Sequence, residues 1–166
     1  DKNKLVNIAA DHLAACGYTE IMSNSLTKAA YYDGLEAYKA ENCVKIMNPL
    51  SADLNVMRQT LLFNALEAVE LNINHRNADL KLFELGNCYF FDSSIENEEN
   101  PLARYSEKYR IAIAVTGLDA APSWNVKAQS ASFYTLRATV EKLLRRFGID
   151  IYTLRSESSQ SDLYSD

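Results

Sequence analysis

The sequence has few of the residues that build compact chemical sites. Its 166 residues include five glycines, and none of them forms a phosphate-binding loop of the G-x-x-x-x-G-K type. It contains no Gly-x-Ser-x-Gly, His-Glu-x-x-His or Cys-x-x-Cys motif. No apolar run approaches the length that spans a bilayer. The motifs of phosphate-loop enzymes, serine hydrolases and zinc proteases are therefore excluded, and we expect no membrane association.

Cysteine is scarce as well, with three residues at Cys16, Cys43 and Cys88. Their spacing fits neither a zinc knuckle nor a disulfide framework. We expect three small buried thiols, which are typical of a protein in the reducing cytosol. This cysteine usage predicts a cytoplasmic location.

Positive charge is also in short supply. The formal net charge is -5 and the pI is about 5.1, whereas a domain whose main task is to grip nucleic acid is usually basic. The charge is uneven, because residues 92–108 carry five acids against two bases and residues 137–146 carry four bases against one acid. Glu96, Glu98 and Glu99 could bind calcium, but they lack the Asp/Asn and Gly pattern of a calcium loop. We expect a solvated run of charge there instead.

Hydrophobic periodicity is what the sequence does provide. Hydrophobic residues make up 48% and charged residues 23%, which are the values of a globular domain with a core. Apolar positions recur at helical spacing over residues 2–16, 62–73 and 133–147. Thr60 and Ser132 are suited to cap the second and third helices. The buried face of the second helix is predicted to comprise Leu62, Ala65, Leu66, Val69 and Ile73.

Strand patterns fill the intervals between these helices. Residues 80–91 are apolar on both alternating faces, which is typical of a strand in a sheet that is covered on both sides. Residues 92–108 are predicted to be an exposed loop. Shorter strands are expected at 19–26, 43–47, 109–116 and 149–154. This series of elements indicates an α+β fold, with an antiparallel sheet flanked by helices.

The order of several short phrases resembles a known family. Residues 48–62 read N-P-L-S-A-D-L-N-V-M-R-Q-T-L-L, Asn72 and Arg76 follow as N-x-x-x-R, and residues 82–86 read L-F-E-L-G. The phrases G-Y-T-E at 17–20 and F-Y-T-L-R-A-T-V-E at 133–141 extend the likeness over most of the chain. Together they resemble the catalytic-like module of the beta subunit of bacterial phenylalanyl-tRNA synthetase.

The resemblance implies the antiparallel sheet of class II aminoacyl-tRNA synthetases. Further strands follow the region of Tyr152 in this family, so we expect a sheet that is truncated at its C-terminal end. One synthetase-like domain is expected over residues 1–155, with a polar tail over 156–166 that leads to those strands. The chain begins at Asp1 and has no methionine before Met22, so we interpret it as a segment of a longer protein.

The resemblance also implies a function. In this family two alpha and two beta subunits form a phenylalanine–tRNA ligase, and the alpha subunit carries the sites for ATP, phenylalanine and Mg²⁺. This chain is then a non-catalytic assembly module that supports the ATP-dependent charging of tRNA(Phe). The tRNA would be bound by the holoenzyme and not mainly by this domain. We expect no catalytic, cofactor-binding or metal-binding residue in the chain itself.

The residues that a class II enzyme uses on ATP are missing here. Such enzymes place one arginine on the strand pair of their second motif and another in a glycine-rich motif, because the guanidinium fork matches phosphate oxygens. No arginine follows residues 83–86 until Arg104, and Arg137-Ala138 stands where relatives often have Lys-Gly. Two alternatives stay open: a divergent adenylating domain with its own ATP site, and a free-standing interaction protein with a synthetase-like fold.

The resemblance places a candidate subunit interface in the segment from Asn48 to Arg58, together with parts of the helix that follows. Arg58 could bind a phosphate or carboxylate, or it could pair with Asp53 or Glu67 at the helix start. Glu84 is the one carboxylate on the buried strand and needs a basic partner, for which Arg76 and Arg58 are the candidates. The predicted interface residues are Asn48, Pro49, Leu50, Asp53, Met57 and Arg58.

Overall fold

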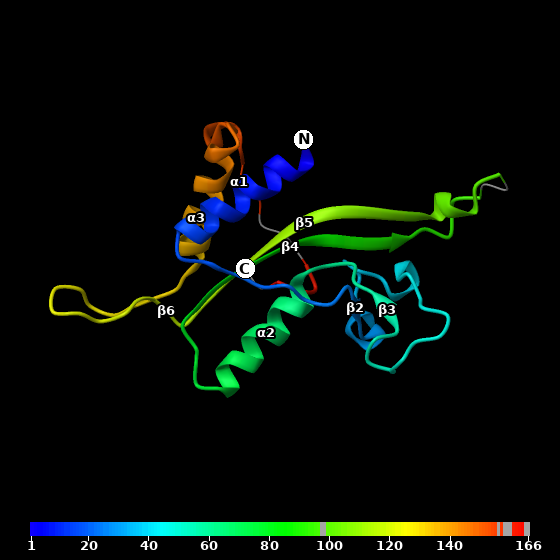
Figure 1. Cartoon of the computed structure of the whole chain (residues 1–166), viewed down its shortest axis with the longest axis horizontal. Coiled ribbons are helices and arrows are strands. Elements are labelled where there is room, and N and C mark those ends of the chain that lie inside the picture. The colour runs from blue at the N-terminus through cyan, green and yellow to red at the C-terminus, as the bar shows by residue number, and fades with distance from the viewer. Residues whose placement is uncertain (97–98, 156, 158–160, 165–166) are drawn as a thin grey trace. The chain divides into compact units, whose positions relative to one another are not determined.

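The structure is a computed structural model that describes residues 1–96, 99–155, 157 and 161–164 (Figure 1). Glu98 of the predicted acidic run, and six of the residues of the predicted tail, lie outside the described residues. The chain divides into two compact units. The first unit comprises Asp1–Met22, Ala65–Leu85 and Ile111–Ser156, and the second comprises Ser23–Asn64, Gly86–Arg110 and Glu157–Asp166.

Two capped helices belong to the first unit. Helix α1 (Lys2–Ala15) begins where the Asp1 carboxylate accepts a hydrogen bond from the Asn3 amide at 3.0 Å. Its chain turns away at Gly17, whose φ of +85° suits glycine. Helix α3 (Phe133–Arg146) begins with a capping box between Ser132 and Thr135. The sequence predicts both helices, and the structure confirms them.

Helix α2 (Leu62–Asn74) is confirmed near its predicted bounds, but its predicted buried face is partly wrong. The Thr60 hydroxyl accepts a hydrogen bond from the Leu62 amide at 3.2 Å, as expected of a cap. Ala65 and Val69 are buried, whereas Leu66 is 53% exposed and Ile73 is 48% exposed. The small residue Ala68 packs on the sheet in their place, because the helix turns a narrower apolar face inward than the sequence suggests.

The main sheet has the strand order β1-β4-β5. Strand β4 (Leu80–Phe91) has the predicted bounds, and Figure 1 shows β5 (Tyr105–Thr116) running back beside it. Strand β1 (Thr19–Glu20) pairs with β4 in parallel, so the sheet is mixed and not purely antiparallel as predicted. The predicted exposed loop is also too long, because β5 begins at residue 105 and a 3-10 helix, η3, occupies Pro101–Arg104.

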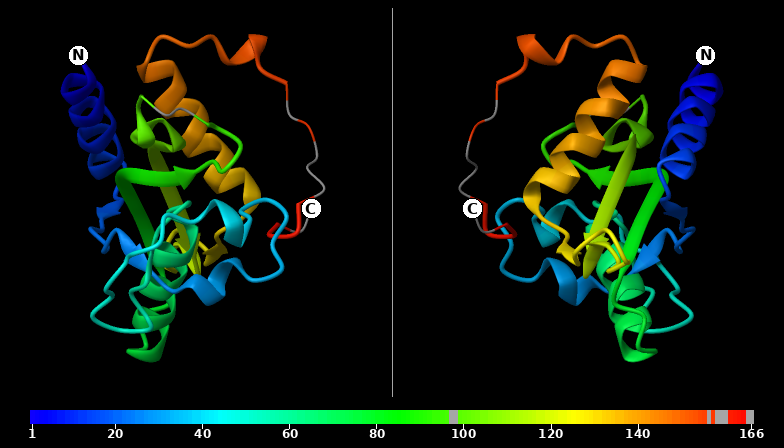
Figure 2. Two further views of the ribbon diagram at one scale, coloured as in Figure 1. Left: turned by 90° about the vertical axis from the view of Figure 1, so that its right-hand side faces the viewer. Right: turned by 90° about the vertical axis from the view of Figure 1, so that its left-hand side faces the viewer.

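The sheet of the first unit is covered on both faces, as the two apolar faces of β4 predict. On one face, Phe83 packs with Leu13 of α1 and Leu143 of α3. On the other face, Leu80 and Leu82 pack with Val69 of α2. Figure 2 shows α1 and α3 from two sides of this arrangement.

The second unit contains little regular structure. Strands β2 (Leu26–Thr27) and β3 (Val56–Met57) form an antiparallel pair, and the 3-10 helices η1 (Ala29–Tyr32) and η2 (Ala40–Asn42) lie between them in the chain. The strand predicted at 19–26 is therefore interrupted. The strand predicted at 43–47 is reduced to one isolated bridge, between Lys45 and Val56.

Two further expectations are wrong in the first unit, and one element there was not predicted. Ile151–Thr153 is a 3-10 helix (η4) and not part of a strand, because the Asp150 carboxylate accepts a hydrogen bond from the Tyr152 amide at 3.0 Å and holds a turn. A short hairpin of β6 (Leu118–Ala120) and β7 (Gln129–Ser130) was not predicted. Cys16 is exposed beyond the end of α1, whereas Cys43 and Cys88 are buried as expected.

The helices of the described part of the chain are too short or too polar to cross a membrane.

Candidate subunit interface

The predicted interface segment forms a closed loop in the second unit. The Ile46 amide donates to the Asn55 carbonyl at 3.0 Å, and the Met57 amide donates to the Val44 carbonyl at 2.9 Å. These bonds join the two ends of the segment, so residues 47–54 project between them as a loop. We call residues 47–54 the interface loop.

The interface loop presents two large apolar side chains to solvent. Leu50 is 101% exposed and Met47 is 93% exposed. Asn48 and Pro49 are also exposed, and the Asp53 carboxylate lies 3.9 Å from the Lys28 ammonium. Met47 was missed by the sequence analysis, which assigned it to a strand. Its position directly before the Asn-Pro turn was the signal that could have identified it.

Arg58 lies beneath the surface of the second unit with 3% of its area exposed. Its Nε donates to the Asn87 carbonyl at 3.0 Å, and its backbone carbonyl accepts from the Tyr89 amide at 2.8 Å. A Cβ added at Gly86 would collide with its guanidinium. Arg58 therefore ties the base of the interface loop to β4. Its predicted place in an interface stays a prediction.

Gln59, the next residue in the chain, also makes buried hydrogen bonds. Its Nε2 donates to the Lys39 carbonyl at 2.9 Å and lies 3.0 Å from the Cys43 sulfur. Its backbone amide donates to the Tyr32 hydroxyl at 3.0 Å. Burial raises the pKa of Tyr32 to about 12 and also raises the pKa of the Cys43 thiol. Both groups are therefore neutral at physiological pH and serve as hydrogen-bond partners.

The two residues of the predicted structural ion pair, Glu84 and Arg76, differ in their exposure to solvent. Glu84 is 2% exposed in the middle of β4, and burial of a carboxylate requires a donor or cation nearby. Arg76 is exposed just after α2, where its backbone takes a φ of +63°. The assignment of Arg76 as the partner of Glu84 stays a prediction.

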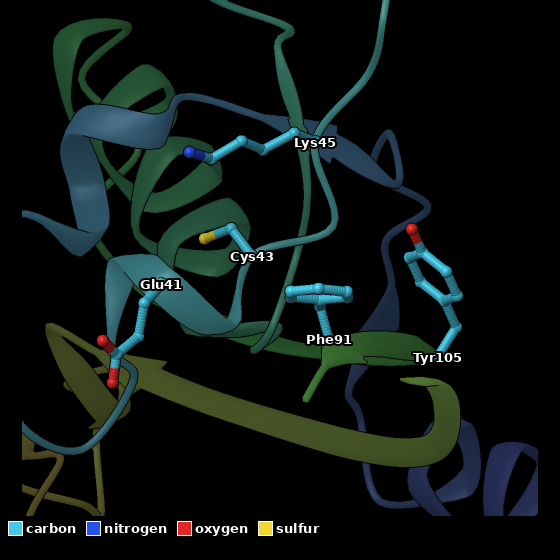
Figure 3. A pocket seen from close by; sticks show the side chains of 5 residues that line it. All are labelled: Glu41, Cys43, Lys45, Phe91 and Tyr105. Carbon is cyan, nitrogen blue, oxygen red and sulfur yellow. The ribbon is translucent and has the colours of Figure 1, made fainter. Parts of the chain in front are cut away.

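A cavity of about 210 Å³ opens in the second unit (Figure 3). It is lined by Glu41, Cys43, Lys45, Phe91 and Tyr105, and the rings of Phe91 and Tyr105 lie 5.3 Å apart. Pockets for drug-sized ligands usually measure roughly 300–1,000 Å³. One lysine beside one carboxylate does not make a cradle for a triphosphate.

The arginines of the second unit contact their own chain. Arg104 Nε donates to the Ile95 carbonyl at 2.7 Å, and the Arg110 guanidinium lies 5.6 Å from the centre of the Phe90 ring. Arg58 is buried as described. Each of these three arginines is therefore engaged by its own chain. Among the residues that the structure describes, no group of three acidic, histidine or cysteine side chains could ligate a metal ion.

The sequence has close relatives among known proteins. Over residues 1–164 it matches the family described as "Phenylalanyl tRNA synthetase beta chain CLM domain". The phenylalanine–tRNA ligase beta subunit of Bacteroides fragilis is 51% identical over 163 residues, which cover 98% of this chain and 20% of that protein. The corresponding subunit of Porphyromonas gingivalis is 39% identical over 162 residues, with the same two shares. The chain spans about a fifth of the length of these relatives.

Two solved structures of synthetase type have a similar fold. The ATP phosphoribosyltransferase regulatory subunit/histidyl-tRNA synthetase from Bacillus halodurans C has a TM-score of 0.63 at 15% identity, over 90% of this chain and 34% of that one. The pyrrolysyl-tRNA synthetase from Desulfitobacterium hafniense has a TM-score of 0.60 at 15% identity, over 88% of this chain and 47% of that one. At such low identity the likeness concerns the fold alone. It confirms the predicted α+β fold of class II synthetases.

Proposed function

This chain belongs to the family of phenylalanyl-tRNA synthetase beta chain CLM domains, and from that premise we propose that it is a non-catalytic assembly module of a phenylalanine–tRNA ligase. The family match over residues 1–164 is the observation that carries the proposal. The module would act in the cytoplasm, within an assembly of two alpha and two beta subunits. The alpha subunit would charge tRNA(Phe) with phenylalanine.

The chemistry of the second unit supports a non-catalytic role. Arg58, Arg104 and Arg110 are engaged with their own chain, and the nearby cavity is small and has one lysine. ATP and Mg²⁺ would therefore be bound by the alpha subunit, and no step of the reaction would involve a side chain of this module. The formal net charge of -5 supports tRNA binding by the holoenzyme and not mainly by this domain.

The interface loop is the surface that we propose for contact with the alpha subunit. Burial of a leucine side chain contributes roughly 1.5–3 kcal/mol, and Leu50 and Met47 are both available for it. The loop is closed by backbone hydrogen bonds, so little conformational entropy would be lost on binding. Arg58 would contribute indirectly, by fixing the base of the loop.

An assembly experiment tests the role of the interface loop. A full-length beta chain that contains this sequence would be mixed with its alpha subunit, and the complex measured by sedimentation velocity. Leu50→Asp is expected to weaken assembly at least about tenfold, because it places a charge in the contact. Leu102→Asp is the matched control, since Leu102 is 72% exposed in η3, outside the loop. Assembly of Leu50→Asp at wild-type strength would contradict the proposed contact.

We also propose that residues 1–155 act as one synthetase-like domain with a polar tail over 156–166. The chain contains two compact units, and a single domain requires that both units unfold together. Hydrogen exchange near the unfolding transition provides the measurement. Equal free energies of opening for core amides of both units are expected, and independent unfolding of one unit would overturn the single-domain assignment.

A further inference from the structure

Asn55 is the first residue after the interface loop, and it bonds three other segments of the second unit. Its amide donates to the Thr27 carbonyl at 3.2 Å, and its carbonyl accepts from the Ile46 amide at 3.0 Å. Its side-chain oxygen, Oδ1, accepts from the Ala29 amide at 2.9 Å. Any residue could make the two backbone bonds, whereas the third requires a short side chain that carries an acceptor.

The side-chain bond of Asn55 caps the 3-10 helix η1. Ala29 is the first residue of η1, and the amides at the start of a helix have no partner within the helix. Lys28 occupies the N-cap position, but its side chain makes no capping hydrogen bond. Asn55 therefore supplies, from a different part of the chain, the acceptor that a residue at the N-cap usually provides.

Lys28 makes a second connection between η1 and the interface loop. Its ammonium lies 3.9 Å from the Asp53 carboxylate and 5.6 Å from the centre of the Tyr31 ring. The Asp53 side chain is 73% exposed, so this ion pair contributes little stability by itself. It places the end of the loop against the same short helix that Asn55 caps.

Helix η1 is itself fixed by the packing of its aromatic side chains in the second unit. Tyr32 is 0% exposed and packs with Cys43 and Val56. The Tyr31 ring stacks on the Phe63 ring, with 5.1 Å between their centres. Closely packed side chains have few alternative positions, so η1 is held in one place within its unit. A loop end that is bonded to η1 is held in the same way.

We propose that Asn55 is a positioning residue for the interface loop. Its side chain fixes the direction in which the loop enters β3, and thereby the places of Met47 and Leu50. These two side chains are 93% and 101% exposed, so their positions depend on the backbone that carries them. A contact whose residues must be ordered on association binds more weakly. The inference rests on the proposed function, because it concerns the same contact with the alpha subunit.

Substitutions in a full-length beta chain test this role. Asn55→Ala removes the acceptor of the Ala29 amide and is expected to weaken assembly with the alpha subunit roughly three- to tenfold. Asn55→Asp keeps an acceptor on a side chain of the same length and should assemble as the wild type does. Asn100→Ala is the matched control, because the Asn100 side chain accepts from the Leu102 amide at 3.1 Å and caps the 3-10 helix η3. This control should lose similar stability but assemble normally.

Hydrogen exchange of the beta chain alone provides a readout that does not depend on the alpha subunit. The Ile46 amide is bonded at the base of the interface loop, and the Leu54 amide donates to the Ser51 carbonyl within the loop at 3.2 Å. Both amides are expected to exchange faster in Asn55→Ala, because the loop end is then less firmly held. In Asn55→Asp and Asn100→Ala they should exchange as slowly as in the wild type.

The outcomes separate this inference from the proposed function. Weaker assembly and faster loop exchange in Asn55→Ala, both recovered in Asn55→Asp, support the positioning role. If Leu50→Asp weakens assembly while Asn55→Ala assembles normally, the inference fails and the proposed function stands. If Leu50→Asp assembles normally, the proposed contact fails, and loop exchange alone decides whether Asn55 holds the loop: faster exchange supports that role, and unchanged exchange overturns it. Equal weakening of assembly in Asn55→Ala and Asn100→Ala would reflect lost stability alone and would overturn the positioning role.

Discussion

In the first unit the largest buried side chains are apolar, whereas in the second unit polar side chains share the interior. Phe83 and Leu13 are 1% and 0% exposed in the first unit, between helices and strands of regular form. Gln59 and Arg58 are 1% and 3% exposed in the second unit, where 3-10 turns and loops predominate. Irregular backbone leaves amides and carbonyls without regular partners, so buried polar side chains must satisfy them.

The two units therefore stabilise their structures in different ways. The first unit keeps its sheet by burying apolar area, which tolerates sequence change if volume is preserved. The second unit keeps the interface loop through a few specific hydrogen bonds, which tolerate little change. The predictions below test this contrast, beginning with the largest expected effect.

Removing a buried ring tests the apolar interior of the first unit. Phe83→Ala is expected to lower the free energy of unfolding by about 3–5 kcal/mol, since it leaves a cavity between α1, α3 and β4. Urea unfolding of the chain measures the loss. Phe133→Ala is the control, because Phe133 is 66% exposed and should cost less than about 1 kcal/mol. Equal losses in the two variants would contradict the assigned core.

Alkaline pH tests the polar interior of the second unit. The pKa of Tyr32 is raised from its ordinary 10.0 to about 12 by burial, so the folded state holds the proton more tightly than the unfolded state does. The resulting stability is complete below pH 10.0 and is lost as pH rises through about 12. The difference amounts to at most about 3 kcal/mol.

Tyr32→Phe lacks this titration and provides the comparison. Unfolding free energies of wild type and variant would be measured below and above the interval. The wild type should lose more stability than the variant as the pH rises. Parallel losses in the two proteins would show that Tyr32 titrates normally.

Loss of one amide side chain tests the hydrogen bonds around Gln59. Gln59→Leu keeps the side-chain size but leaves the Lys39 carbonyl without its donor, so we expect a loss of about 1–3 kcal/mol. Hydrogen exchange should accelerate in residues 39–59 before it accelerates in α1. Gln129→Leu, in the exposed strand β7, is the control with no expected loss. Faster exchange in α1 than in residues 39–59 would refute the local role of Gln59.

The cap of α3 is expected to have the smallest effect. Ser132→Ala removes the acceptor for the Thr135 amide and should cost about 1 kcal/mol. Thermal unfolding measures the change, and Ser130→Ala in exposed β7 is the comparison. A loss as large as that of Phe83→Ala would mean that α3 depends on its cap more than on its packing.

The sequence predicts some elements of the fold and misses others, for physical reasons. The bounds of β4 and the cap of α3 follow from local patterns, namely two apolar faces and a serine before a helical stripe. The β6–β7 hairpin has strands of three and two residues, which are too short to show an alternating pattern, so periodicity does not reveal it. The strand predicted at 149–154 does not form, because the hydrogen bond from the Tyr152 amide to the Asp150 carboxylate holds a turn there.

The candidate interface was predicted only in part. The motif around Asn48 located the segment, but periodicity could not tell that Met47 and Leu50 would be exposed, because apolar residues are expected to be buried. The burial of Arg58 also escaped prediction, since it depends on the approach of Gly86 in a different segment of the chain. Local sequence patterns therefore predict where helices and strands form, whereas the exposure of Met47 and Leu50 and the burial of Arg58 depend on tertiary contacts.

The central claim is that this synthetase fold has lost its nucleotide site and serves another subunit. Isothermal titration with Mg·ATP, applied to a full-length beta chain alone and to its complex with the alpha subunit, tests that claim most directly. The account predicts saturable binding by the complex and none by the beta chain. Saturable binding by the beta chain alone that is lost in Lys45→Ala or Arg110→Ala would contradict it.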